Sequence, residues 1–550
     1  MRRITQVPYF LPALVSLCIS VAGIVVSYTH WEKGKLVRFA LMDDAMISMS
    51  FARSLVEGCG LVWYCGAPKV EGYTNLGWVL YMAFWHLWGI PAAYTSIPIF
   101  LTGLFTLVWH IRGIYQLTSL FDKKAAQIAV WMTAIFPPII FHHTSGLEAG
   151  FLAMLLTYFL YEMLRPSGSI TRMAGIAAVG TLVRLDFILG VTAISGAKAL
   201  SLRGDKVSNQ TKAKKWEPSW LPIILALLVA LATTFWRKSY YGLWVPNTYT
   251  LKVSSVPFSW RVLNGLIAAL MHVGMNLPAW ALAGVGFWAW RFTSQAWICM
   301  SVLGISMAYS IYVGGDIYES ASWSNRFLMN GFAPLLLFAS IGVIKISSSH
   351  ITQGLLVLLV SYGLPMPLPS QIGYRWKGLF RSQETAYFPV DGIFPPKARL
   401  LIGPAGTTPY FLRDYEWIDA FGKVDTAVAR RGLVVLCNGR PPFLYFPGHT
   451  RVDTFRLWDA DGIVGATFIS PSFCTDSTAP PLSRWWWFRF VRFVSPCKEA
   501  VPAWFPFPTP AFRERFCATY EPVEGILITW KRKAAASSAD SSEYASKAHP

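Results

Sequence analysis

Residues 9–28 read YFLPALVSLCISVAGIVVSY, an apolar run without a charged side chain. An α-helix needs ~20 apolar residues to cross the hydrocarbon core of a bilayer. The run is too long for the apolar region of a typical secretion signal, and no small-residue cleavage site follows it. We therefore expect a first membrane helix here, with Arg2 and Arg3 on the cytoplasmic side.

The composition of the whole chain agrees with this interpretation. The 550 residues are 54% hydrophobic and only 14% charged, whereas soluble domains carry about 25% charged residues. The 25 tryptophans suit the two membrane interfaces. We attribute the formal net charge of +19 to loops that meet anionic headgroups or phosphates. Membrane lipid is thus an expected partner, and nucleic acid is not.

Further apolar runs lie at 76–90, 97–115, 126–141, 147–164, 173–185, 187–200, 219–236, 275–290, 296–313, 330–346 and 351–367. Basic clusters that should be cytoplasmic are Lys123–Lys124, Arg165 with Arg172, and residues 203–215. All three clusters lie on the cytoplasmic side only if 173–185 and 187–200 each cross the membrane and 76–90 makes no net crossing. The pattern predicts about eleven crossings, with the N-terminus inside and the C-terminus outside.

The composition of the sequence changes after the last long apolar run. We expect a polytopic α-helical membrane domain over residues 1–367, whose first outer loop is 29–75. Short strand-like runs such as Leu400–Ile402 then predict a soluble α/β domain on the outer side, over 368–532. The Ser/Ala-rich tail, 533–550, is predicted to be disordered.

The first outer loop carries an acidic pair, Asp43–Asp44, in the stretch LMDDAMISMSFARSLVEGCGLVWYCGAPKVEGYTNLGW (41–78). A helix with interfacial spacing is expected from Ala45 onward. Adjacent carboxylates near lipid repel each other unless a cation or hydrogen-bond donor compensates them. The pair is a candidate catalytic or metal-binding site, and one of the two carboxylates could instead only cap the helix.

Further polar groups fall at the same predicted face, each with a structural alternative. His143 and Glu148 join two helices and could bind substrate or cap helix ends. Arg184 could hold an anionic headgroup or bridge to Asp186. The remaining candidates are Arg237, Lys238, Asn247, Lys252, Asp316 and Arg326. Snorkelling among aromatics is the alternative for the cations of 236–252, and an Asp316–Arg326 pair could be purely structural.

Acids and cations gathered around one cavity suit transfer from a lipid-linked phosphate donor. A carboxylate would take the proton of an acceptor hydroxyl, and cations would neutralise the leaving phosphate. Two alternatives remain open: a transporter or flippase for a lipid-linked sugar, and a glycan-binding assembly protein of the cell envelope. Six cysteines outside the apolar runs permit disulfides, with Cys59 and Cys65 the obvious local pair.

The order of short motifs adds a family resemblance. DDAMISMSFARSLVEG, VEGYTNLGW, SGLE, RLD, VPNTYTLK, GGD and RF follow one another within residues 1–335. In this order they resemble the GT-C glycosyltransferases that use polyprenyl-phosphate sugars, and most closely the terminal arabinofuranosyltransferases of bacterial cell envelopes. RLD departs from the Arg-Pro-Asp or Arg-Pro-Glu often found in relatives, which affects turn geometry rather than charge.

The resemblance implies an inverting transfer of arabinofuranose at the outer face of the bacterial cytoplasmic membrane. Asp43 is then the expected general base, with Asp44 beside it, and Lys252 and Arg326 meet the donor phosphate. The acceptor would be a glycan, a lipid-linked glycan or a protein. No nucleotide cofactor is implied. A divalent cation is left open, with Asp43, Asp44 and Asp316 as candidate ligands.

Overall fold

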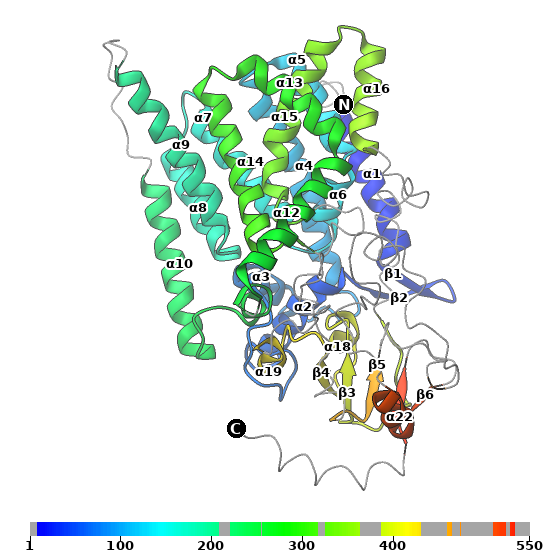
Figure 1. Cartoon of the computed structure of the whole chain (residues 1–550). Coiled ribbons are helices and arrows are strands. Elements are labelled where there is room, and N and C mark those ends of the chain that lie inside the picture. The colour runs from blue at the N-terminus through cyan, green and yellow to red at the C-terminus, as the bar shows by residue number, and fades with distance from the viewer. Residues whose placement is uncertain are drawn as a thin grey trace. The chain divides into compact units, whose positions relative to one another are not determined.

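The computed structural model describes residues 8–207, 220–254, 256–316, 325–363, 387–430, 459–464, 474, 510–523 and 529–533. Four features of the sequence lie outside these residues: Arg2 and Arg3, the predicted boundary at 367/368, the tail beyond Lys533, and the cysteines at 437 and 497. The described chain divides into two compact units (Figure 1).

The first unit comprises Met1–Ser48, Thr74–Val245 and Arg261–Glu384. The second comprises Met49–Tyr73, Pro246–Trp260 and Thr385–Pro550. Helix α2 (Asp43–Val56) therefore contributes its first turns to the first unit and its remainder to the second. Whether these units correspond to the membrane and outer domains expected from the sequence stays a prediction.

The first unit is a helical bundle. Its helices are α1 (Phe10–Ser27), α3 (Leu76–His86), α4 (Ser96–Ser119), α5 (Lys123–Ala134), α6 (Pro137–Thr144), α7 (Ala149–Leu164), α8 (Ile170–Val183), α9 (Phe187–Val207), α10 (Trp220–Tyr241), α13 (Leu277–Trp290), α14 (Ser294–Val313), α15 (Phe332–Ile346) and α16 (His350–Tyr362). Helix α12 (Phe258–Met275) begins in the second unit and continues into this one. A short hairpin, β1 (Thr29–Glu32) and β2 (Lys35–Phe39), follows α1.

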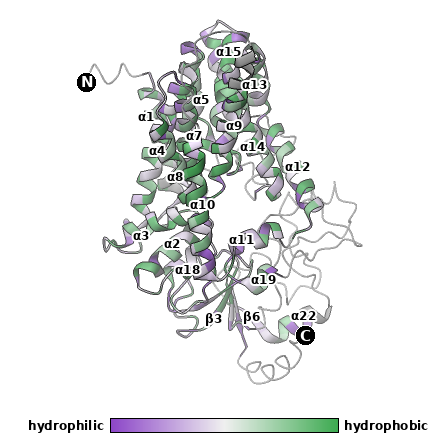
Figure 2. Ribbon diagram, turned by 90° about the vertical axis from the view of Figure 1, so that its left-hand side faces the viewer, coloured by the Kyte–Doolittle hydropathy of each residue, from purple (hydrophilic) through white to green (hydrophobic). Residues whose placement is uncertain are grey.

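Several of these helices are suited to a bilayer. Among the described residues, four segments are long and apolar enough to cross a membrane: α4, α10, α14 and Met329–Ile346. Two bent helix pairs would raise the number to six, and hydrophobic residues run along many of the bundle helices (Figure 2). The fold is thus the helical, membrane-type fold that the sequence predicts, while the predicted eleven crossings stay a prediction.

Two helical segments differ from the sequence-based expectation. The apolar run 126–141 forms not one helix but α5 and α6, bent by 59°. Pro137 and Pro138 begin α6 and cannot extend the preceding helix, because they lack a backbone N–H. Helix α12 was not expected, since the buried polar side chains of Arg261, Asn264 and His272 interrupt its apolar pattern.

The second unit contains a five-stranded sheet of order β4-β3-β5-β7-β6. Strand β3 (Arg399–Ile402) pairs in parallel with β4 (Glu416–Asp419) and β5 (Gly462–Val464). Strand β7 (Trp530–Arg532) is antiparallel to β5 and to β6 (Tyr520–Pro522). Helices α18 (Thr407–Phe411), α19 (Thr426–Arg430) and α22 (Pro510–Thr519) accompany the sheet. Whether this mixed sheet belongs to an outer α/β domain over 368–532 stays a prediction.

Segments distant in sequence hold the second unit together. The amide Nδ2 of Asn247 donates to the backbone carbonyls of Gly422 and Lys423, at 2.8 and 2.9 Å. The indole of Trp63 donates to the Ala405 carbonyl at 3.0 Å. The short segment 246–254, which contains α11 (Asn247–Tyr249) and the π-helical turn η1 (Thr250–Ser254), is thereby fixed against the turn that precedes α19.

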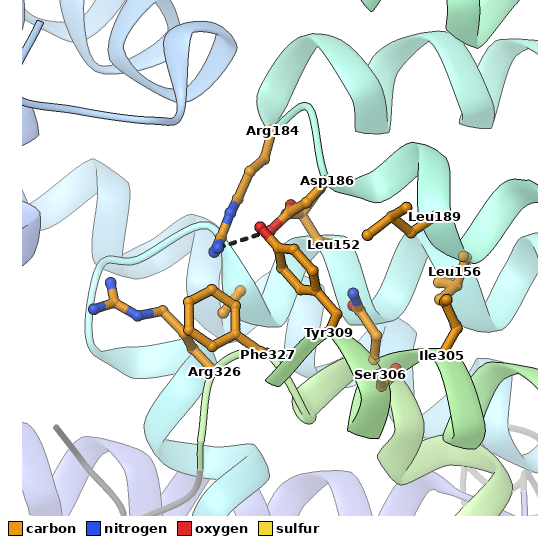
Figure 3. A pocket seen from close by; sticks show the side chains of 13 residues that line it. Leu152, Leu156, Arg184, Asp186, Leu189, Ile305, Ser306, Tyr309, Arg326 and Phe327 are labelled. Carbon is orange, nitrogen blue, oxygen red and sulfur yellow. Dashed lines mark ion pairs between the residues drawn. The ribbon is translucent and has the colours of Figure 1, made fainter. Parts of the chain in front are cut away.

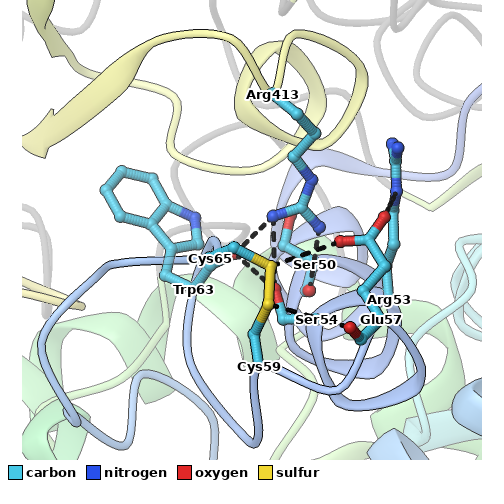
Figure 4. The surroundings of a disulfide bond; sticks show 8 residues. All are labelled: Ser50, Arg53, Ser54, Glu57, Cys59, Trp63, Cys65 and Arg413. Atoms are coloured by element: carbon cyan, nitrogen blue, oxygen red, sulfur yellow. Dashed lines mark hydrogen bonds and ion pairs between the residues drawn. A yellow bond between two sulfur atoms is a disulfide. The ribbon is translucent and has the colours of Figure 1, made fainter. Parts of the chain in front are cut away.

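The Cys59–Cys65 disulfide closes a small loop after α2 (Figure 4). Beside it, the guanidinium of Arg413 donates to the carbonyls of Ser50 and Trp63, both at 3.0 Å. The local cysteine pair expected from the sequence is thus confirmed. A second disulfide joins Cys474 to Cys517.

Candidate functional site

The acidic pair lies in the first turn of α2, which begins at Asp43. Negative side chains are favoured there by the helix dipole and its unpaired N–H groups. The preceding backbone is fixed, because Met42 N–H donates to the Ser145 carbonyl at 3.1 Å. The adjoining Gly146 has a φ of +83°, and a Cβ there would lie only 2.6 Å from Leu41. The start of α2 is therefore held tightly against the turn that leads into α7.

Asp44 and Asp316 share one cation, Arg326. The guanidinium contacts Asp316 through two bonds, Nε–Oδ2 at 2.9 Å and Nη2–Oδ1 at 3.1 Å, and contacts Asp44 Oδ2 at 3.1 Å. The Asp316 side chain is fully buried, and those of Arg326 and Asp44 are 11% and 15% exposed. Gly314 and Gly315, with φ of +89° and +83°, form a tight turn ahead of Asp316.

A second ion-pair cluster centres on Arg184, at the turn between α8 and α9. Its guanidinium lies 3.0 Å from Glu148 and 2.8 Å from Asp186. Burial alone would lower the pKa of Arg184, but the two carboxylates outweigh it, so the net pKa is raised and the guanidinium stays charged. The local bridge to Asp186 was one of the alternatives from sequence, whereas Glu148 is an additional partner.

Asn75 connects this second cluster to α2, and sequence reasoning did not single it out. Its Nδ2 donates to Glu148 Oε2 at 2.7 Å, and its Oδ1 accepts from the Ser48 hydroxyl at 3.1 Å. Ser48 lies one helical turn after Asp44 on α2. The only signal in the sequence was a polar residue placed directly before an apolar helix.

Both clusters border one pocket between α7, α9 and α14 (Figure 3). Arg184 and Arg326 reach it from different segments, and the ring of Phe327 lies 5.0 and 5.9 Å from their guanidinium carbons. The other side of the pocket is apolar, formed among others by Leu152, Leu156, Leu189 and Ile305. The pocket therefore has a charged side and an apolar side.

The other predicted site residues are placed elsewhere. His143 is buried and hydrogen-bonds Thr106 and His110, both at 2.9 Å. The Lys238 ammonium donates to the Gly242 carbonyl at 2.8 Å, next to the ring of Trp244. Arg237 is buried near the end of α10. Asn247 and Lys252 belong to the second unit.

Two of the three candidate metal ligands, Asp44 and Asp316, contact an arginine side chain. The Arg326 guanidinium bonds both Asp44 and Asp316, and a divalent ion sharing these carboxylates would have to lie beside that positive charge. Within the described residues, no three His, Cys, Asp or Glu side chains gather as a metal site. The residues present thus fit an ion-pair network better than a metal centre.

No known family model matches the chain. Two solved structures resemble it in fold: ArnT from Cupriavidus metallidurans bound to undecaprenyl phosphate (TM-score 0.46, 13% identity, 74% of this chain and 85% of that one), and the oligosaccharyltransferase of Archaeoglobus fulgidus with a tethered acceptor peptide (TM-score 0.42, 11% identity, 75% and 63%).

In sequence, the chain is 27% identical over 257 residues to the terminal beta-(1->2)-arabinofuranosyltransferase of Mycobacterium tuberculosis. The match covers 43% of this chain and 38% of the relative, so the chain spans well under half the length of the curated protein it matches. This similarity confirms the resemblance to terminal arabinofuranosyltransferases predicted from the motifs.

Proposed function

We propose that the protein is a membrane glycosyltransferase. It transfers a sugar, arabinofuranose by its resemblance, from a polyprenyl-phosphate donor to an acceptor hydroxyl at the outer face of a bacterial cytoplasmic membrane. The acceptor is a glycan, a lipid-linked glycan or a protein. No nucleotide takes part, because the donor already carries an activated sugar on its phosphate.

The observation that carries this proposal is the two-sided pocket next to the acidic helix. A polyprenyl phosphate has an anionic head and a long apolar tail, and the pocket offers two arginines on one side and leucine and isoleucine side chains on the other. Arginine suits a phosphate because its planar fork can donate two parallel hydrogen bonds. The cavity measures about 20 Å³, so in this proposal Arg184 and Arg326 face the donor head, and the pocket widens before its apolar side receives any of the tail.

Within the acidic pair, we assign the general base to Asp43 and a positioning role to Asp44. Asp44 accepts from the Arg326 guanidinium through Oδ2 at 3.1 Å, a contact that positions its carboxylate, and the family resemblance assigns the base to Asp43. Asp43 precedes it in the same first turn of α2. Asp43 would take the acceptor hydroxyl proton, the oxygen would attack the anomeric carbon from the face opposite the phosphate, and the configuration would invert.

The test uses the purified full-length chain in detergent with polyprenyl-phospho-arabinofuranose and candidate acceptors. Mass spectrometry of the products should show a glycosylated acceptor and free polyprenyl phosphate. Since a positioned general base contributes about 10²–10⁴-fold in rate, Asp43→Asn should lose at least two orders of magnitude with an unchanged thermal midpoint. Asp122→Asn is the matched control, because Asp122 caps the start of α5 through bonds to Lys124 N and Ala125 N.

Three results would contradict the proposal. Full transfer by Asp43→Asn would remove the assigned base. Movement of the lipid-linked sugar across sealed vesicles, with no transfer to any acceptor in detergent, would identify the protein as a transporter instead. An anomeric configuration retained in the product would contradict the single-displacement step.

A further inference from the structure

A second pocket lies between α4, α7 and α8. Helix α7 contributes to both pockets. Its N-terminus follows Glu148 of the candidate site, and its C-terminus leads to Arg165 at the second pocket. The 16 residues of α7 rise by about 24 Å at ~1.5 Å per residue. That length approaches the ~30 Å of a bilayer core. The linings meet at the middle of α7, and the charged groups of the two pockets lie toward its opposite ends.

One part of this pocket is apolar and faces outward from the bundle. Its lining includes Phe105, Trp109 and Val179, whose exposed fractions are 61%, 36% and 46%. The cavity measures about 680 Å³, which falls within the range of about 300–1,000 Å³ found for small-molecule sites. In a membrane-spanning bundle, exposed side chains of this kind meet acyl chains.

The other part is cationic. Arg112, Arg165 and Arg172 all line the pocket, together with one acid, Glu162. Glu162 is buried and forms ion pairs with Arg165 at 2.8 Å and with Arg172 at 3.5 Å. It also accepts the Ser169 N–H at 2.9 Å. Three guanidiniums against one carboxylate leave this group with an excess of positive charge.

Two of the arginines are held against aromatic rings. The guanidinium of Arg112 lies 4.6 Å from the ring centre of Trp109, and that of Arg165 lies 5.4 Å from the ring centre of Tyr161. The Arg172 side chain is 59% exposed. Snorkelling explains single arginines at a membrane boundary. Three arginines around one cavity, two of them tied to the same buried carboxylate, form a built site with a charged end and an apolar wall.

We propose that this groove binds an anionic glycerophospholipid of the adjoining leaflet, which the positive-inside pattern of Arg165 and Arg172 predicts to be the cytoplasmic one. The lipid phosphate would lie among the arginines, and one acyl chain would follow the wall formed by Phe105, Trp109 and Val179. A free phosphate would leave that wall unused, and a zwitterionic lipid would supply no net negative charge to balance the guanidiniums. The site is separate from the proposed glycosyltransferase site and does not depend on its chemistry.

Native mass spectrometry of the full-length protein in detergent tests this proposal, with phosphatidylglycerol and phosphatidylcholine as probes. Phosphatidylglycerol should bind more tightly than phosphatidylcholine. The double variant Arg112→Gln/Arg172→Gln should bind phosphatidylglycerol roughly thirtyfold more weakly. Each arginine near an anionic lipid headgroup contributes about fivefold to the affinity, and the two contributions multiply. Arg165 is left unchanged because its bond to Glu162 stabilises the fold. Should the double variant fail to fold, Arg172→Gln alone should weaken binding roughly fivefold.

The matched control is Arg291→Gln. Arg291 also stacks on aromatic rings, 3.8 Å from Trp288 and 4.2 Å from Phe292, and it lies just before α14 but outside the groove. This variant should bind phosphatidylglycerol as the unmodified protein does. A photoactivatable phosphatidylglycerol should cross-link to α4 or α8 in the unmodified protein and lose that cross-link in the arginine variants.

Three outcomes would overturn the proposal. One is an equal affinity of the unmodified protein for phosphatidylglycerol and phosphatidylcholine. Another is an unchanged phosphatidylglycerol affinity in the folded arginine variants. The third is displacement of the cross-linked lipid by polyprenyl phosphate at equimolar concentration, which would assign the groove to the lipid carrier instead.

Discussion

Arg326→Gln is the substitution that bears most directly on the ion-pair network of α2. It removes a cation that bonds both the fully buried Asp316 side chain and Asp44. Removing one partner of a buried ion pair costs about 3–5 kcal/mol, because the remaining charge is uncompensated. We therefore expect the unfolding equilibrium to shift by roughly 10²–10⁴-fold toward the unfolded state.

A double variant separates charge compensation from mere loss of packing. Asp316→Asn/Arg326→Gln removes the buried acid together with its cation, and it should recover most of the stability lost in Arg326→Gln. Thermal and denaturant unfolding in detergent, followed by tryptophan fluorescence, measures the stability of the single and of the double variant. Arg291→Gln, a substitution of a ring-stacked arginine outside the network, should stay within about 0.5 kcal/mol of the unmodified protein.

Two results would refute this reasoning. A loss below about 1 kcal/mol in Arg326→Gln would place the pair in the range of solvent-exposed salt bridges. A double variant no more stable than the single one would show that Asp316 is not the charge being compensated. Activity provides a separate readout: if Arg326 also contacts the donor phosphate, the double variant should regain stability without regaining a normal KM for the donor.

Three further predictions concern other parts of the chain. Asn75→Ala should cost about 1–3 kcal/mol in unfolding free energy, because Glu148 loses a buried amide donor; Asn75→Asp, which repels Glu148, should cost more. Burial raises the pKa of Asp419 to about 6, although hydrogen bonds from the backbone N–H groups of Val424 and Phe421 lower it in part. Between the ordinary Asp pKa and this value, the folded protein keeps a proton on Asp419 that the unfolded chain has lost. The unfolding free energy should therefore fall by up to about 3 kcal/mol between roughly pH 4 and 6, and Asp419→Asn should flatten that dependence in an unfolding series across pH. Replacing Cys59 and Cys65 by serine should cost about 2 kcal/mol for so short a loop, measured as faster hydrogen exchange over 49–73.

Local features of the fold could be predicted from the sequence because they depend on nearby residues. The apolar run 97–115 lies within α4, and the run 296–313 lies within α14. The charged turn around Arg184 separates α8 from α9 as the basic anchors required. The Gly-Gly turn before Asp316 also follows from residue type, since glycine adopts positive φ without steric cost.

Long-range pairings could not be predicted in the same way. Asp44 and Arg326 are 282 residues apart, and no local period indicates that they meet. The sequence suggested Asp316 and Arg326 as a pair only because both flank one short segment. Asn247 illustrates the converse: it was a candidate for substrate binding, and its amide nitrogen bonds two carbonyls of the second unit. A polar residue in a motif can serve the fold, the site or both, and only the fold shows which contacts it makes.

The ion pairs of the candidate site also bear on the proposed reaction. Arg184 pairs with Glu148 and Asp186, and Arg326 pairs with Asp44 and Asp316. Each guanidinium therefore stabilises buried carboxylates in addition to the donor contact proposed for it. The family resemblance adds Lys252 as a further cation for the donor phosphate. Lys252→Gln should then raise the KM for the donor with little loss of stability, whereas Arg184→Gln should lose stability first; an unchanged donor KM in Lys252→Gln would mean that the cation comes from elsewhere in the chain.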